Sequence, residues 1–171
     1  MDWVQPVVVA VTGHRNSGKT TAIERIIAIL GRDFRVATIK HCHHGADFDR
    51  PGKDSWRHRK AGSFATAIVG AGETVVMRQA VEDDPVATAR WAFPEADIVL
   101  AEGFHWLPLP RVEIESSDGN TRPAHPDGVT ISRLPHMFVD DDVRAVARQV
   151  GDLLLDRPAH RVRGPEPALH S

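Results

Sequence analysis

The feature that most constrains this sequence is a glycine-rich segment lying between two apolar patterns of different period. The β-branched run Pro6–Val11 predicts a strand that is buried on both faces. Directly after it comes Gly13-His14-Arg15-Asn16-Ser17-Gly18-Lys19-Thr20, which matches G-x-x-x-x-G-K-[ST]. From Lys19 the apolar residues recur at helical spacing, and Gly31 ends the pattern. This strand–loop–helix order predicts a P-loop, which binds phosphate.

Each part of such a loop has a chemical reason. Small residues let successive backbone N–H groups curl around phosphate oxygens. The ammonium of Lys19 would reach the β- and γ-phosphates, and the hydroxyl of Thr20 would ligate Mg²⁺. The helix that follows adds the positive end of its dipole to the same anion. Nucleotide binding is therefore the first functional expectation.

The rest of the chain alternates strand and helix patterns. Arg35–Lys40 completes a β-α-β unit, which implies a right-handed crossover and parallel strands. Further strands are expected at Phe64–Val69, Thr74–Met77, Asp97–Ala101, Arg111–Glu115 and Val129–Ser132. Further helices are expected at Pro85–Phe93 and Asp140–Leu155, and a short one, capped by Asp54 or Ser55, through Lys60. The sequence thus predicts an α/β fold of the P-loop NTPase type, with a mostly parallel sheet flanked by helices.

Composition limits the class of protein. With 171 residues the chain has the size of one domain, expected as a single nucleotide-binding domain over 1–156. Residues 157–171 hold three prolines and no periodicity, so we expect a disordered tail. The net charge of −2 gives no reason to expect a nucleic-acid partner, and no apolar run is long enough for a membrane span. A single cysteine, Cys42, and no visible signal peptide favour a cytoplasmic protein.

A P-loop protein needs an acidic residue at the end of another strand to hold Mg²⁺. Glu102 follows the apolar run Asp97–Ala101 and would emerge at the carboxyl edge of the sheet, where ligands of open α/β sheets bind. Glu102 is therefore the candidate metal partner of Thr20. Asp97 begins the same strand, so we expect it at the opposite edge in a structural role.

The polar run His41-Cys42-His43-His44 follows the strand Arg35–Lys40 and leaves the sheet at the same edge. Imidazole and thiolate groups suit Zn²⁺ or Ni²⁺, but neighbouring residues of an extended chain point to opposite faces. Contact with a phosphate or a second anionic substrate is a second interpretation, and a role in ordering the loop is a third. The residues alone leave all three open.

These motifs, taken in order, resemble one family. The resemblance rests on the P-loop, on Ile39-Lys40-His41-Cys42-His43-His44, on Asp49-Arg50-Pro51-Gly52-Lys53-Asp54-Ser55 with Arg59-Lys60-Ala61-Gly62, and on Leu100-Ala101-Glu102-Gly103-Phe104. Together they look like MobB, the GTP-binding adaptor family of molybdopterin-guanine dinucleotide biosynthesis. The resemblance covers about residues 6–115 and is weak beyond them.

The resemblance implies a homodimeric protein that binds GTP with Mg²⁺, hydrolyses it slowly and assists a MobA-type guanylyltransferase. Carried over by position, it assigns nucleotide contacts to Gly13, Asn16, Ser17, Gly18, Lys19, Thr20 and Thr21. It places His41, His43, His44, Lys53 and Asp54 along the same edge, and it assigns Mg²⁺ to Thr20 and Glu102. No residue is identified as a general base.

The chain departs from the family pattern in its last third. Family members typically carry Ser-Asp at the end of a strand, where we would expect the guanine base, and this chain has Ser132-Arg133. A carboxylate accepts hydrogen bonds from guanine, whereas arginine has no acceptor. Asp140 or Asp141 could substitute. The sequence therefore leaves the choice between guanine and adenine open.

Two other functions fit some of the same residues. A small-molecule kinase would use a basic lid, and Arg50, Lys53, Arg57, Arg59 and Lys60 would suit one. A nickel or zinc metallochaperone GTPase would use the histidine-rich run, although the chain has no long His-rich tract to store metal. Preference for ATP would favour the kinase, and metal binding would favour the metallochaperone.

Overall fold

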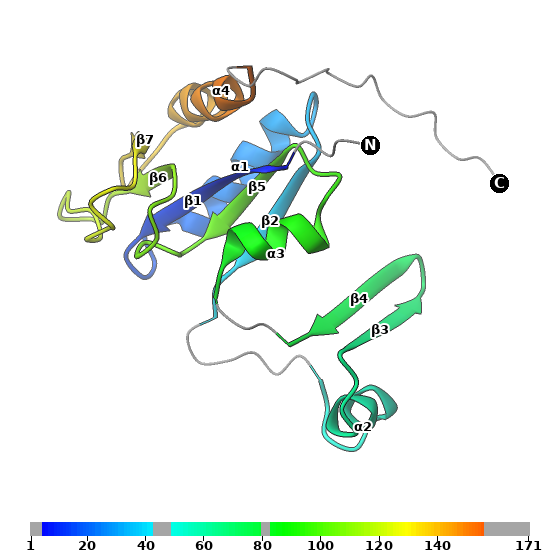
Figure 1. Ribbon diagram of the computed structural model, residues 1–171. Coiled ribbons are helices and arrows are strands. Elements are labelled where there is room, and N and C mark those ends of the chain that lie inside the picture. The colour runs from blue at the N-terminus through cyan, green and yellow to red at the C-terminus, as the bar shows by residue number, and fades with distance from the viewer. Residues whose placement is uncertain (1–4, 43–48, 80–82, 156–171) are drawn as a thin grey trace. The chain divides into compact units, whose positions relative to one another are not determined.

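The computed structural model describes residues 5–42, 49–79 and 83–155, and these form two compact units. We call residues 5–41 and 84–155 the sheet unit, and the described residues within Cys42–Asp83 the hairpin unit. The hairpin unit is inserted in the chain between a strand and a helix of the sheet unit (Figure 1). The predictions for His43, His44 and the tail 157–171 lie outside the described residues. The single domain expected over 1–156 stays a prediction.

The sheet unit contains five parallel strands: β1 (Val7–Gly13), β2 (Val36–Lys40), β5 (Ile98–Glu102), β6 (Arg111–Ile114) and β7 (Thr130–Leu134). Their order is β2-β5-β1-β6-β7, and every neighbouring pair is parallel. The α/β class predicted from the sequence is confirmed. Because the strands run the same way, their carboxyl ends meet at one edge, at the end of β1 where the P-loop begins.

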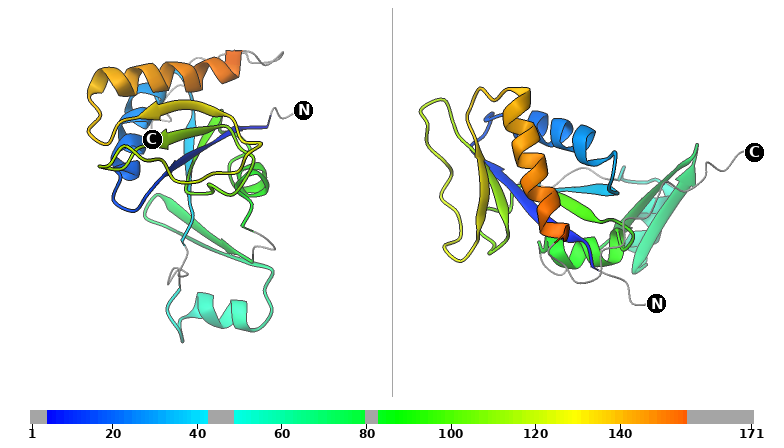
Figure 2. Two further views of the ribbon diagram at one scale, coloured as in Figure 1. Left: turned by 90° about the vertical axis from the view of Figure 1, so that its left-hand side faces the viewer. Right: turned by 90° about the horizontal axis from the view of Figure 1, so that it is seen from above.

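Three helices cover the two faces of this sheet (Figures 1 and 2). They are α1 (Lys19–Leu30), α3 (Pro85–Ala92) and α4 (Asp140–Leu155). Alternate residues of β1 point to opposite faces: Val9 and Val11 pack with α1 and α4, and Val8 packs with α3. Both faces are covered, which is why β1 is buried along its whole length and has no polar alternation.

The helix α1 forms as its sequence predicts. Ala22, Ile23, Ile26 and Leu30 are its buried residues, and they recur on one face at helical spacing. Its first residue follows Gly18, which adopts a left-handed conformation with φ of 92°. Residues 14–18 therefore form a short loop, which is anchored by the end of β1 on one side and by the start of α1 on the other.

The hairpin unit consists of one helix and two strands. The helix α2 spans Asp54–Lys60, and the strands β3 (Ala65–Gly70) and β4 (Glu73–Arg78) pair antiparallel with each other. Ala71 and Gly72 connect them, with φ values of 52° and 79°, as a two-residue turn of type I′ requires. Few of its side chains are buried; Met77 and Thr66 are the buried residues of β3 and β4.

Candidate phosphate-binding site

The loop between β1 and α1 is bent at its second half by two left-handed residues. Asn16 has φ of 63° and Gly18 has φ of 92°. The backbone of such a loop turns its N–H groups inward, as phosphate-binding loops do. Asn16 tolerates this conformation better than most residues that carry a side chain. The sequence motif therefore produces the loop geometry that its chemistry requires.

The N-terminus of α1 has no side chain to cap it. Gly18 supplies no side-chain hydrogen bond, and the first turn contains no acidic residue. The start of α3 is different, because Asp84 accepts hydrogen bonds from the backbone N–H groups of Val86 at 2.8 Å and Ala87 at 3.2 Å. The first N–H groups of a helix need an acceptor. At α1 they are available to an anion.

Close packing explains the two glycines of the loop. A Cβ atom on Gly13 would lie 2.8 Å from the carbonyl oxygen of Ile114, closer than real side chains approach. A Cβ on Gly18 would lie 3.2 Å from the ring of Phe138, which follows β7. Beside them, Ser17 is 2% exposed, and its hydroxyl has no hydrogen-bond partner among the described residues. A buried hydroxyl without a partner is a group that a bound phosphate would satisfy.

Lys19 lies folded against its own loop. Its ammonium donates hydrogen bonds to the carbonyl oxygens of Gly13, at 3.1 Å, and of His14. Burial lowers the pKa of Lys19 below its ordinary 10.5, and the negative charge of Glu102 partly opposes that shift. An ammonium held at the mouth of the loop is in position to contact an anion seated on the N–H groups.

Glu102 lies at the carboxyl end of β5, as predicted. It is in register with Val11 of β1 and with Lys40 of β2. Its side chain is 17% exposed, and its carboxylate forms an ion pair with the ammonium of Lys40 at 3.5 Å. Asp97 lies at the opposite end of the strand from Glu102, as predicted. Its carboxylate accepts a hydrogen bond from the backbone N–H of Arg35 at 2.7 Å, which is a structural role.

These residues fit a Mg²⁺ ion held by few protein ligands. Thr20 is exposed in the first turn of α1, and Glu102 lies at the neighbouring strand end. Mg²⁺ usually keeps several waters and binds one or two protein groups together with phosphate oxygens. Within the described ranges, no group of three His, Cys, Asp or Glu side chains that could hold a metal occurs. This observation leaves His43 and His44 untested.

His41 follows β2 and packs between aromatic rings. Its imidazole meets the ring of Phe104 at 5.3 Å and that of Trp106 at 4.8 Å, both edge-on. These contacts hold the imidazole next to the chain that follows Glu102. Cys42 is exposed and forms no disulfide. The contacts favour the interpretation in which His41 orders this loop, and they leave its contact with an anion as a prediction.

The predicted site residues come from both units. Gly13, Asn16, Ser17, Gly18, Lys19, Thr20 and Thr21 lie together in the loop and the first turn of α1. Lys53 and Asp54 belong to the hairpin unit, at the start of α2, and their part in the phosphate site stays a prediction. Sequence patterns assign residues to elements, and they do not determine how an inserted unit is placed.

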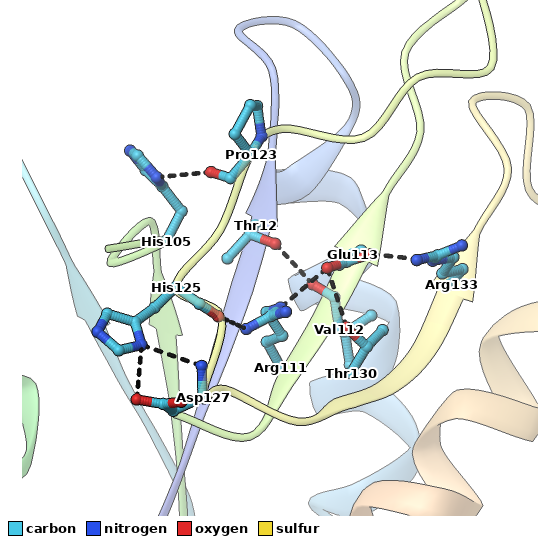
Figure 3. Close-up of polar contacts among 10 residues, drawn as sticks. All are labelled: Thr12, His105, Arg111, Val112, Glu113, Pro123, His125, Asp127, Thr130 and Arg133. Carbon is cyan, nitrogen blue, oxygen red and sulfur yellow. Dashed lines mark hydrogen bonds and ion pairs between the residues drawn. The ribbon is translucent and has the colours of Figure 1, made fainter. Parts of the chain in front are cut away.

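Arg133, which replaces the acid expected in the family, has a carboxylate partner. Its Nε donates to one oxygen of Glu113 at 2.9 Å, and Arg111 Nε donates to the other oxygen at 2.8 Å (Figure 3). Thr130 donates a third hydrogen bond to Glu113 at 3.0 Å. Glu113 is buried at 4% exposure. Arg133 therefore serves as one of the partners that keep a buried carboxylate charged.

Sequence reasoning missed one cation near the loop. The charge of Arg122, in the connection between β6 and β7, lowers the pKa of Lys19, as does that of Lys40. This connection is tied to the chain after β5, because the ring Nδ1 of His105 and the carbonyl oxygen of Pro123 form a hydrogen bond of 3.0 Å (Figure 3). No spacing in the sequence marks Arg122, since its position depends on how a long loop folds back.

Comparison with known proteins identifies the family. Residues 8–132 match the family model described as MobB, molybdopterin guanine dinucleotide synthesis protein B. The chain belongs to the MobB family. It is 34% identical over 108 residues to the molybdopterin-guanine dinucleotide biosynthesis adapter protein of Haemophilus influenzae, covering 61% of this chain and 61% of that protein. A probable adapter protein of Bacillus subtilis is 37% identical over 112 residues, covering 64% of this chain and 65% of that protein.

The solved structures agree with the MobB assignment. The crystal structure of Bacillus subtilis MobB superposes with a TM-score of 0.61 at 32% identity, covering 85% of this chain and 98% of the other. The match spans less than two thirds of the length of the Haemophilus and Bacillus adapter proteins. Among the described residues, no helix is long and apolar enough to cross a membrane.

Proposed function

We propose that this MobB-family chain is an adapter of molybdopterin-guanine dinucleotide biosynthesis that binds GTP with Mg²⁺ and assists a MobA-type guanylyltransferase. The observation that carries the nucleotide part is the N-terminus of α1, which has neither a side-chain cap nor an acid in its first turn. The pathway and the adapter role rest on the family and on the names of the relatives. A homodimer and a cytoplasmic location complete the proposal.

The residues divide the work of binding. The N–H groups of the loop and of the first turn of α1 would hold phosphate oxygens, and Lys19 would neutralise their charge. Thr20 and Glu102 would hold Mg²⁺, which supplies further charge neutralisation on the phosphates. Glu102 would contact the metal, and the ammonium of Lys40, which pairs with Glu102 at 3.5 Å, would add positive charge near the phosphates.

Turnover should be slow, because the sequence identifies no residue as a general base for water. We expect hydrolysis near the rate of unassisted GTPases, roughly 10⁻⁴–10⁻³ s⁻¹. A rate above about 1 s⁻¹ without a partner would contradict the adapter role and favour an enzyme. Transfer of phosphate to an acceptor, rather than to water, would favour the kinase alternative.

The test is a titration with fluorescent GTP and ATP analogues, each with and without Mg²⁺. We expect tighter binding of GTP that depends on Mg²⁺, and a loss of about 100-fold or more in Lys19→Ala, because a charged hydrogen-bond donor is removed. Arg32→Ala, which removes an exposed cation just after α1, is the matched control. Preference for ATP, or normal binding by Lys19→Ala, would overturn the assignment. Co-elution with a MobA-type guanylyltransferase and sedimentation of the free chain test the partner and the homodimer.

A further inference from the structure

The hairpin unit contains a cavity of its own, of about 300 Å³. Its lining comes from α2, from the two residues before β3, and from the end of β4 with the residue after it. The residues that line it include Trp56, Arg59, Lys60, Phe64 and Met77. All of them belong to one compact unit, so the cavity does not depend on the sheet unit. Pockets for small molecules begin at about this size.

Two aromatic side chains, Trp56 and Phe64, line the cavity. Phe64 is 72% exposed, which is unusual for an aromatic side chain that packs in a core. The ammonium of Lys60 lies 5.5 Å from the centre of the Trp56 ring, and the guanidinium of Arg78 lies 4.7 Å from that of Phe64. Each ring is therefore paired with a cation, and the rings remain available to a flat ligand.

One cation of the cavity, Arg59, has partners within the hairpin unit. The guanidinium of Arg59 contacts the carboxylate of Asp49 at 3.5 Å and the sulfur of Met77 at 3.5 Å. Ser55 donates a hydrogen bond of 2.8 Å to the same Asp49. These contacts connect Arg59, in α2, to Asp49 and to Met77 of β4, and they leave donors for a ligand, because a guanidinium has five N–H groups.

The second cation, Lys60, has no carboxylate within ion-pair distance among the described residues. The segment 53–60 holds four cations (Lys53, Arg57, Arg59 and Lys60) and a single acid, Asp54. Positive charge beside exposed aromatic faces favours a ligand that is both flat and anionic.

We propose that this cavity binds a planar aromatic anion, a flat ring that carries a phosphate or carboxylate group. The ring packs against Trp56 and Phe64, and the anionic group is bound by Lys60 and Arg59. None of the residues that line the cavity belongs to the P-loop, and the proposal does not rest on nucleotide binding there.

In the experiment, the full-length chain is titrated with 1-naphthyl phosphate, and binding is measured by isothermal titration calorimetry. The titration is repeated with Lys19→Ala. We expect saturable binding in both, because the P-loop takes no part. Cyclohexyl phosphate and inorganic phosphate, which carry the charge without an aromatic ring, should bind at least about fivefold more weakly. Equal binding of all three probes, or binding that disappears in Lys19→Ala, overturns the proposal and assigns the anion to general charge or to the P-loop.

Matched variants locate the site. Lys60→Gln and Phe64→Ala should each weaken binding of 1-naphthyl phosphate by about fivefold to tenfold. Arg57→Gln removes a cation of the same helix that does not line the cavity, and Val69→Ala shortens an exposed apolar residue of β3; both should bind as the wild type does. Equal losses in Arg57→Gln would overturn the proposal. If Phe64→Ala also abolishes self-association, while Lys60→Gln leaves both self-association and binding unchanged, the cavity belongs to an interface between copies and the proposal is overturned.

Discussion

The P-loop end of β1 and the β6–β7 part of the same sheet differ in how completely their polar groups are hydrogen-bonded. On β6 and β7, the buried carboxylate of Glu113 has three donors, from Arg111, Thr130 and Arg133. At the P-loop, α1 begins without a cap, and the hydroxyl of Ser17 is buried without a partner among the described residues. Complete pairing is typical of groups that stabilise a fold, and incomplete pairing is typical of groups kept for a ligand.

Removing the centre of the paired network should have the largest effect on stability. Glu113→Gln leaves Arg111 buried without a counter-charge, so we expect a loss of about 3 kcal/mol in the free energy of unfolding. Chemical denaturation measures it, and Glu115→Gln, two residues further along the chain, is the control. A loss equal to that of the control would mean that the network is not the stabilising element.

The same variant should change how stability depends on pH. Burial alone would raise the pKa of Glu113, but hydrogen bonds from Arg111, Thr130 and Arg133 hold it below its ordinary 4.5. A carboxylate with a lowered pKa in the folded state stabilises above its unfolded pKa, and this stability is lost as pH falls through the folded pKa. Denaturation between pH 6 and pH 3 should therefore show a smaller loss in Glu113→Gln than in the wild type. Parallel curves would contradict this assignment.

Arg133→Ala should have a smaller effect, because the arginine side chain is 61% exposed and Arg111 keeps its own bond to Glu113. We expect a loss of about 0.5–1 kcal/mol by thermal or chemical denaturation. The ratio of GTP to ATP affinity should stay unchanged, since Arg133 is directed at Glu113. A changed ratio would show instead that Arg133 acts on the base.

The smallest effect concerns the start of α1. Thr21→Glu places an acid in the first turn, so it should raise stability by about 0.5 kcal/mol while weakening binding of the GTP analogue. Thr21→Gln has a similar shape without the charge, so it should weaken binding less and should not raise stability. If both variants bind the analogue equally well, the N-terminus of α1 is not where the phosphates lie.

Most of the sheet unit could be predicted because its signals are local. The buried run before Gly13 and the helical repeat after Lys19 determine β1 and α1, and Asp84 followed by Pro85 marks the start of α3. The order of the strands could not be predicted, since β5 lies between β1 and β2 for reasons of packing across the whole sheet.

The candidate site was predictable where its residues are consecutive, and less so elsewhere. The P-loop and Glu102 follow from strand ends, whereas the Arg133–Glu113 pair joins residues twenty positions apart on neighbouring strands. The antiparallel pairing of β3 with β4, apart from the main sheet, also needed the structure. A strand pattern indicates that a residue is extended, and it does not indicate which sheet the strand will join.

The insertion between β2 and α3 has a consequence for how this chain can be altered. Because β3 and β4 pair with each other and β2 pairs with β5, the main-chain ladders of the described strands close within each unit. Residues 42–83 form one contiguous block with two junctions, His41–Cys42 and Asp83–Asp84. A chimera that exchanges this block with that of another MobB would cut none of these ladders, so the block can be replaced without breaking a strand pairing.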